Sequence, residues 1–180
     1  MNSCASKKNS ASRAFTGFKR QKALSQLILR HYPDVEVIAG VATAGIPQGV
    51  LVAEELNLPF IYVRPKPKEH GMQNCIEGKL DKDQKVVLVE DLISTAGSSI
   101  KAAKNIENEG GIALGIVAIF TYEFPIASEA SKLERVPYYC LSNYSTLIDL
   151  ALEQKLIEAS QVEELKSWRE NPAEWNITTV

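Results

Sequence analysis

The stretch from Val86 to Ser99 orders acidic and hydroxyl side chains in a way that suits a sugar phosphate. Four apolar residues precede the acidic pair Glu90 and Asp91, and a run of small hydroxyl and glycine residues begins at Ser94. Backbone N–H groups and hydroxyls at a helix start bind a phosphate monoester, and two carboxylates can accept hydrogen bonds from sugar hydroxyls. We interpret the stretch as a holder for a ribose 5-phosphate. The alternative is a solvated strand end followed by an ordinary helix cap.

A second group of candidate residues lies in the basic segment 64–71. It holds Arg64, Lys66 and Lys68 against the single acid Glu69, a local surplus of +2, together with His70. Such a cluster could grip a diphosphate through charge-assisted hydrogen bonds. The prolines and glycines around it predict a long loop, which could close over a reacting centre and exclude water. The alternative is a solvated charged loop.

A third candidate is the run of small residues from Ala39 to Pro47. Side chains this small let a backbone approach a ligand closely. The alternative is a tight turn between a strand and a helix.

The elements that must position these segments alternate along the chain. We expect helices over 18–31 and 50–56, after residue 99, between the last two strands and twice after them. The expected strands are 35–39, 60–63, 86–89, 112–120 and 138–141. Alternation of this kind predicts an α/β fold, a Rossmann-like, mostly parallel sheet flanked by helices. Ligands of such sheets bind beyond the carboxyl ends of the strands, where the loops 40–49, 65–79 and 90–99 would lie. Residues 1–17 are expected to be a disordered or loose arm, and residues 18–180 a single domain.

Composition limits the classes of partner. The chain has 180 residues, of which 45% are hydrophobic, and its formal net charge is −2. This balance argues against a nucleic-acid coat, which needs a basic excess, and no apolar run is long enough to span a membrane. Three distant cysteines argue against a disulfide framework. We therefore expect a soluble cytoplasmic protein with neither nucleic acid nor membrane as a partner.

The segment from Glu90 to Ser99 resembles the phosphoribosyl-diphosphate (PRPP) signature of type I phosphoribosyltransferases. Ala96 stands where that family commonly has glycine, a departure that matters if this position needs a positive φ. The string 68–71, followed by Asn74 and residues 76–78, is similar to the catalytic loop of orotate phosphoribosyltransferases. The resemblance covers about residues 33–152. Nothing in residues 1–30 reproduces the family's leading segment, so we expect an atypical or truncated N-terminal segment.

This resemblance implies an enzyme that transfers the ribose 5-phosphate of PRPP to N1 of orotate, giving orotidine 5′-monophosphate and pyrophosphate in pyrimidine biosynthesis. It implies Mg²⁺ bound through PRPP with no direct protein ligand, and a homodimer whose sites are shared across the interface. The implied catalytic residues are Lys68, His70 and Asp91. The implied PRPP-binding residues are Arg64, Lys68, His70, Glu90, Asp91, Leu92, Ile93, Ser94, Thr95, Ala96, Gly97 and Ser98. The implied pyrophosphate loop is Ala42, Thr43, Ala44 and Gly45, and Ser94 is the implied contact to orotate.

Two other functions remain open at this stage. The same fold could be a non-catalytic PRPP-binding regulator, or it could transfer the sugar phosphate to a purine or to uracil. The Lys-x-His-Gly string at residues 68–71 argues against another base.

Overall fold

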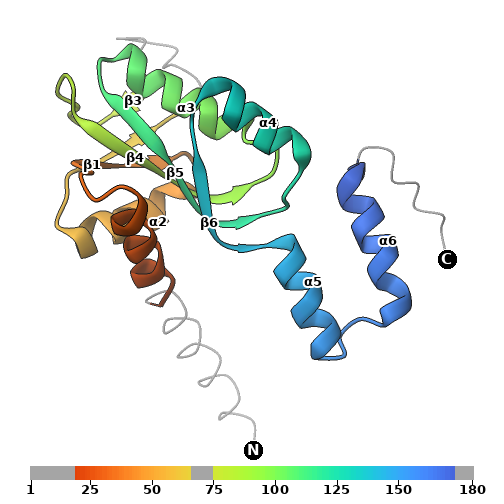
Figure 1. Ribbon diagram of the computed structural model, residues 1–180. Coiled ribbons are helices and arrows are strands. Elements are labelled where there is room, and N and C mark those ends of the chain that lie inside the picture. The colour runs from red at the N-terminus through yellow and green to blue at the C-terminus, as the bar shows by residue number, and fades with distance from the viewer. Residues whose placement is uncertain (1–18, 66–74, 173–180) are drawn as a thin grey trace, which may run out of the picture.

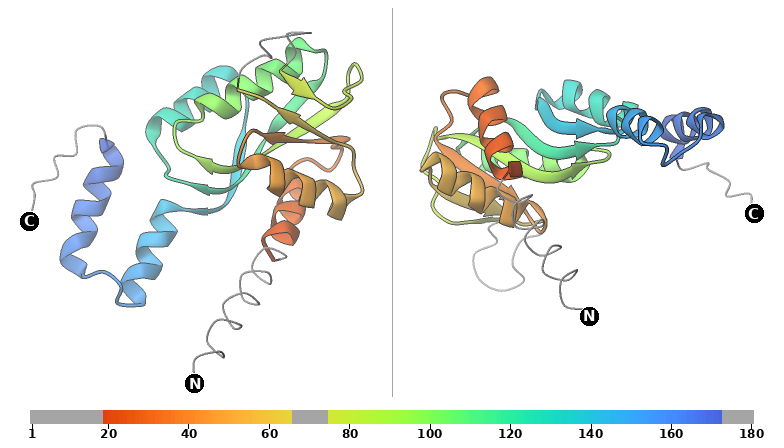
Figure 2. Two further views of the ribbon diagram at one scale, coloured as in Figure 1. Left: turned by 180° about the vertical axis from the view of Figure 1, so that it is seen from behind. Right: turned by 90° about the horizontal axis from the view of Figure 1, so that it is seen from below.

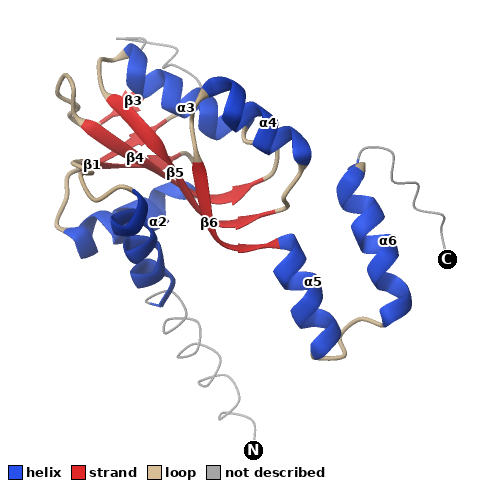
Figure 3. Cartoon of the chain, in the orientation of Figure 1, coloured by secondary structure: helices blue, strands red, loops and turns tan. Residues whose placement is uncertain are grey.

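The fold is built on one six-stranded sheet with the strand order β3-β2-β1-β4-β5-β6 (Figures 1 and 3). The computed structural model describes residues 19–65 and 75–172. The strands are β1 (Val37–Val41), β2 (Phe60–Val63), β3 (Ile76–Glu77), β4 (Lys85–Ile93), β5 (Ile112–Thr121) and β6 (Tyr138–Asn143). All neighbouring strands run parallel except β3, which pairs antiparallel with β2. The predicted α/β class is confirmed.

Helices cover both faces of this sheet (Figure 2). They are α2 (Gly45–Leu56), α3 (Gly97–Asn108), α4 (Pro125–Glu134), α5 (Tyr144–Glu153) and α6 (Ala159–Glu170), preceded by helical residues 19–31. α3 and α4 pack on one face, and α2 packs with residues 19–31 on the other. α5 and α6 form a hairpin that extends away from the sheet (Figure 1). Within the described ranges, no helix has the length and apolar content needed to span a membrane.

The central strand β4 supplies core residues to both faces. Val86 and Leu88 pack with α3, whereas Val87 and Val89 pack with α2 and residues 19–31. Each of these four side chains is fully buried, which stabilises the fold by about 1.5–3 kcal/mol per side chain. A strand buried on both faces must be apolar at every position, so its apolar run is continuous.

α2 begins five residues earlier than the sequence suggests. The expected loop 40–49 is in fact the end of β1, a three-residue loop and the first turns of α2. A Cβ on Gly45 would overlap the carbonyl oxygen of Val89, and one on Gly49 would lie 2.8 Å from the ring of Phe60. These glycines therefore let the helix approach the sheet closely, which a loop prediction based on small residues does not anticipate.

Candidate active site at the carboxyl edge of the sheet

The described parts of the three candidate segments meet at one edge of the sheet. In the parallel register Val41 of β1 lies opposite Val63 of β2, and Gly40 lies opposite Val89 of β4. The carboxyl ends of these strands therefore lie at the same edge of the sheet. They are followed by the small-residue loop, by Arg64 and by the turn that leads into α3. The predicted position of the site, beyond the carboxyl ends of the strands, agrees with this arrangement.

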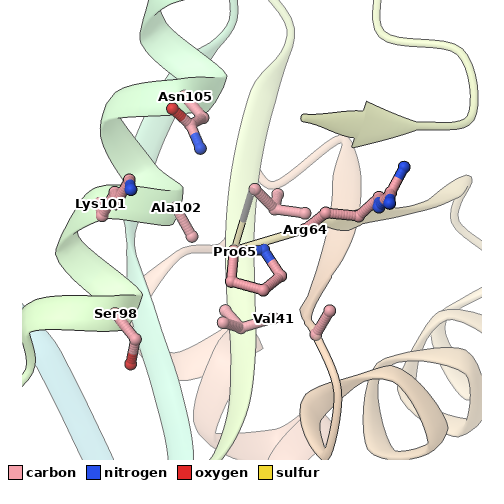
Figure 4. A pocket seen from close by; sticks show the side chains of 9 residues that line it. Val41, Arg64, Pro65, Ser98, Lys101, Ala102 and Asn105 are labelled. Atoms are coloured by element: carbon pink, nitrogen blue, oxygen red, sulfur yellow. The ribbon is translucent and has the colours of Figure 1, made fainter. Parts of the chain in front are cut away.

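A cavity of about 190 Å³ joins residues from these segments (Figure 4). In Figure 4, α3 forms one wall, and Val41, which ends β1, lies across from it together with Arg64 and Pro65, which follow β2. The lining residues are Val41, Ala42, Val63, Arg64, Pro65, Ser98, Lys101, Ala102 and Asn105. Ala42, Arg64 and Ser98, which the sequence assigns to three different binding segments, thus share one cavity.

The turn between β4 and α3 has the form that suits a phosphate. Its residue Ala96 has a φ of 62°, in the left-handed region, and caps α3 without a side-chain hydrogen bond. The N–H groups in the first turn of a helix have no intrahelical partner and bind anions. Position 96 does need a positive φ, so the alanine there carries strain of roughly 1–2 kcal/mol that a glycine would not.

The two acidic residues of β4 have different environments. Glu90 is 7% exposed, and its Oε2 accepts a 3.2 Å hydrogen bond from Oγ of Ser99 in α3. Burial, together with the neighbouring Asp91 carboxyl, raises the pKa of Glu90 to about 8. Asp91 is only partly buried. Asp91 is therefore the more accessible acceptor for a sugar hydroxyl, and Glu90 joins the strand to the start of α3.

Arg64 is one of the residues that line the cavity. Its Nη1 is 3.4 Å from Oε1 of Glu77 in β3, and its backbone N–H donates to the carbonyl of Cys75 at 2.7 Å. In Figure 4 the side chain extends away from α3. Two other cationic candidates, Lys68 and His70, lie outside the described residues.

The small-residue loop lies at the end of β1. Its residues Thr43 and Ala44 are exposed, whereas Gly45 is buried against β4 and begins α2. The peptide bond between Ala42 and Thr43 is cis. Ala42 lines the cavity, so the exposed residues Thr43 and Ala44 follow directly on a residue of its wall.

Two polar residues of the cavity were missed by the sequence analysis. Lys101 and Asn105 follow Ser98 by three and seven positions, a spacing that places them on the same side of α3. Within the described part of the chain, Lys101 has no ion-pair partner, and Nδ2 of Asn105 is buried without a hydrogen-bond partner. Helical spacing from Ser98 is the signal that could have found them.

The protein is an α/β protein with a cavity at the carboxyl edge of its mostly parallel sheet, and its relatives identify its class. Residues 18–152 match the family described as the phosphoribosyl transferase domain. Over 152 residues the chain is 53% identical to orotate phosphoribosyltransferase of Cytophaga hutchinsonii, a match that covers 84% of this chain and 73% of the relative. It is 51% identical to the enzyme of the same name from Bacteroides thetaiotaomicron, with 85% and 72% covered. The chain belongs to the phosphoribosyltransferase family and, within it, to the orotate phosphoribosyltransferases, as the sequence predicts.

Solved structures agree on the fold. The chain matches Leishmania donovani UMP synthase with a TM-score of 0.69 and 23% identity, over 84% of this chain and 32% of that one. It matches orotate phosphoribosyltransferase from Aeropyrum pernix with a TM-score of 0.66 and 22% identity, over 77% and 76%. Both proteins share the mostly parallel sheet flanked by helices.

Proposed function

We propose that this chain transfers the ribose 5-phosphate of PRPP to N1 of orotate and releases pyrophosphate, a step of pyrimidine biosynthesis. In this reaction the bond from C1 of the ribose to the diphosphate oxygen breaks, and its electron pair leaves with the pyrophosphate. The N1–C1 bond forms from the orotate side, and the N1 proton is released. The observation that carries the proposal is the cavity shared by Ala42, Arg64 and Ser98 in a chain 53% identical to an orotate phosphoribosyltransferase.

The ribose 5-phosphate would bind at the β4–α3 turn. The first turn of α3 offers N–H groups, and the exposed side chains of Thr95 and Ser98 offer hydroxyls to the phosphate oxygens. Leu92, Ile93 and Gly97 contribute backbone to this segment. The Asp91 carboxylate would accept hydrogen bonds from the ribose hydroxyls. Binding energy gained here, away from the reacting bond, helps to orient C1.

The diphosphate would lie between the loop after β1 and the cations after β2. The exposed residues Thr43 and Ala44 and the guanidinium of Arg64, which lines the cavity, support this placement. Lys68 and His70 would bring further positive charge to the leaving group. Because negative charge grows on the pyrophosphate in the transition state, positive groups that meet it there accelerate the reaction more than a strong base would.

Mg²⁺ fits the chemistry of this edge, because the partly buried Asp91 carboxylate is an oxygen ligand of the kind that this ion prefers. We propose that the ion is held through the oxygens of PRPP, beside Asp91. When bound, the ion would supply positive charge to the diphosphate oxygens.

We further propose a cytoplasmic homodimer in which Lys68 and His70 reach the partner's site. The resemblance of residues 68–78 to the loop of orotate phosphoribosyltransferases supports the shared site. The charge of PRPP supports the location only in that PRPP does not cross a membrane unaided, so the enzyme must share a compartment with it.

A single-turnover assay tests the proposal. The purified protein is mixed with PRPP and Mg²⁺ and either orotate, adenine, hypoxanthine or uracil, and consumption of PRPP is followed. We expect consumption with orotate only. Turnover with another base would show that this base is the substrate in place of orotate. PRPP binding without turnover for any base would indicate a regulator.

A further inference from the structure

The turn after β5, residues 122–124, lies directly beside the start of the phosphate-binding turn. Thr121 pairs with Ile93 at the ends of β5 and β4, and the backbone N–H of Tyr122 donates to the carbonyl of Ile93 at 3.2 Å. Ser94, the proposed contact to orotate, is the next residue after Ile93. A shift of the turn 122–124 would therefore move the base side of the site.

This turn has a strained shape that needs support. Glu123 has a φ of 59°, in the left-handed region, and its N–H donates to Oγ1 of the buried Thr121 at 3.0 Å. Left-handed backbone costs a residue with a side chain about 1–2 kcal/mol. Such conformations persist where surrounding contacts hold them.

Much of that support comes from a polar cluster formed by Glu123, Ser145 and Arg169, which we call the Glu123 clasp. Oε2 of Glu123 accepts from the N–H of Ser145 at 2.9 Å and from its Oγ at 2.6 Å. Nη1 of Arg169 donates to the same Oγ at 2.8 Å and lies 3.5 Å from Oε2 of Glu123. The Arg169 and Glu123 side chains are 23% and 32% exposed, so water only partly screens the pair.

An aromatic cluster reinforces the clasp. The ring of Trp168 lies 5.6 Å from the rings of both Tyr122 and Phe124, and 5.2 Å from the ring of Tyr144. α6 has no fully buried residue. Trp168 and Arg169 are the α6 residues whose ring and ion-pair contacts reach the turn within the described part of the chain.

We propose that Arg169 is a positioning residue for the base: it holds the turn 122–124 against Ile93 and so sets the orotate side of the site. This inference rests on the proposed function. The phosphate side is anchored separately, through Glu90, Ser99 and the start of α3. Loss of Arg169 is therefore expected to affect the base and not the sugar phosphate. Arg169 also lies beyond residues 18–152, which the family match covers.

Equilibrium binding to the full chain distinguishes an effect on the base side of the site from an effect on the phosphate side, and it does not require turnover. Orotidine 5′-monophosphate and ribose 5-phosphate differ only by the base, and calorimetric titration measures the affinity for each. In Arg169→Gln we expect the affinity for orotidine 5′-monophosphate to fall about tenfold, since charge-assisted hydrogen bonds are worth more than neutral ones. The affinity for ribose 5-phosphate should stay within about twofold. Arg169→Lys should restore part of the loss, because it keeps the charge but not the planar fork.

The matched control is Lys166→Gln, on the same helix, because Lys166 pairs only with Glu163 at 3.0 Å within the described residues and is exposed. It should leave both affinities unchanged. The double variant Glu123→Gln with Arg169→Gln should lose no more affinity than the single variant with the larger loss, since both changes break the same clasp.

Kinetics and amide exchange complete the test. In Arg169→Gln the KM for orotate should rise about tenfold while the KM for PRPP stays constant, and amide exchange at residues 121–123 should become faster. Equal losses for both ligands, additive effects in the double variant, or unchanged exchange would overturn the role of Arg169. If the unaltered protein binds ribose 5-phosphate but not orotidine 5′-monophosphate, the proposed function itself fails, and this inference fails with it.

Discussion

The hydroxyl of Ser99 donates a hydrogen bond to Oε2 of Glu90, and this contact joins the first turn of α3 to the strand that carries the acidic pair. Oε1 of Glu90 accepts at 3.1 Å from the backbone N–H of Asp91. The first acid of the pair is thus part of the framework that places the second. The geometry of the β4–α3 turn and the accessibility of Asp91 therefore depend on one buried carboxyl group.

This arrangement predicts that stability falls as the pH rises. The pKa of Glu90 is raised from 4.5 to about 8 by burial and by Asp91. Between these values the folded chain holds a proton that the unfolded chain has released, so the free energy of unfolding decreases with rising pH and levels off above 8. The loss is on the order of a few kcal/mol. We expect the thermal midpoint of the unaltered protein to fall more steeply with pH than that of Glu90→Gln between pH 5 and 8. Above pH 8 the two curves should run parallel. Parallel curves throughout would contradict a raised pKa.

The strained backbone at Ala96 predicts an unusual order among substitutions. Ala96→Gly removes the strain but loses a buried methyl group and adds chain entropy, so the free energy of unfolding should change by less than about 1 kcal/mol. Ala96→Val adds a β-branched side chain to a buried left-handed position and should cost more than about 2 kcal/mol. Urea denaturation checks both values. A well-tolerated valine would show that position 96 is not held at a positive φ.

The two glycines that begin α2 and α3 should respond differently to alanine. A Cβ on Gly45 would overlap the carbonyl of Val89, whereas one on Gly97 would meet only Oγ1 of Thr95 at 3.8 Å. Gly45→Ala should therefore lower the free energy of unfolding by about 2 kcal/mol or more, because a backbone atom must move. Gly97→Ala should change it by less than about 1 kcal/mol. Chemical denaturation of the two variants measures both free energies of unfolding. Equal losses of stability would show that α2 does not pack this closely against β4.

Lys101 is expected to contribute to PRPP binding, because it lines the cavity and lacks an ion-pair partner among the described residues. Lys101→Ala should raise the KM for PRPP about fivefold, with a weaker effect at high salt. Lys104 is the matched control on the same helix, since its Nζ pairs with Oε2 of Glu134 at 2.6 Å and it does not line the cavity. Lys104→Ala should leave the KM unchanged. If the two variants behave alike, the cavity is not where PRPP binds.

Lys68 is expected to act mainly in the transition state. Lys68→Ala should lower kcat more than it weakens PRPP binding, because the charge on the leaving group is greatest as the bond breaks. Steady-state kinetics combined with a direct measurement of PRPP affinity separates the two effects. A loss of affinity with kcat unchanged would contradict the proposed role.

Local patterns in the sequence were sufficient for the order and type of the main elements. The apolar run 86–89 identified the central strand because a strand buried on both faces has no polar position. The spacing of acids, hydroxyls and glycine from Glu90 to Ser99 predicts a sugar-phosphate turn, and the string at 68–71 indicated the orotate branch of the family. Each of these signals lies within about fifteen consecutive residues.

The tertiary structure decided which distant residues meet. Burial makes Glu90 a framework group while Asp91 stays accessible, although the two are adjacent in sequence. Lys101 and Asn105 join Arg64 around one cavity only because α3 packs beside the ends of β1 and β2. Arg169 meets Glu123 across 46 positions of chain because the α5–α6 hairpin turns back. Periodicity and motifs record short-range preferences, whereas burial and long-range contacts arise only when the helices pack on the sheet.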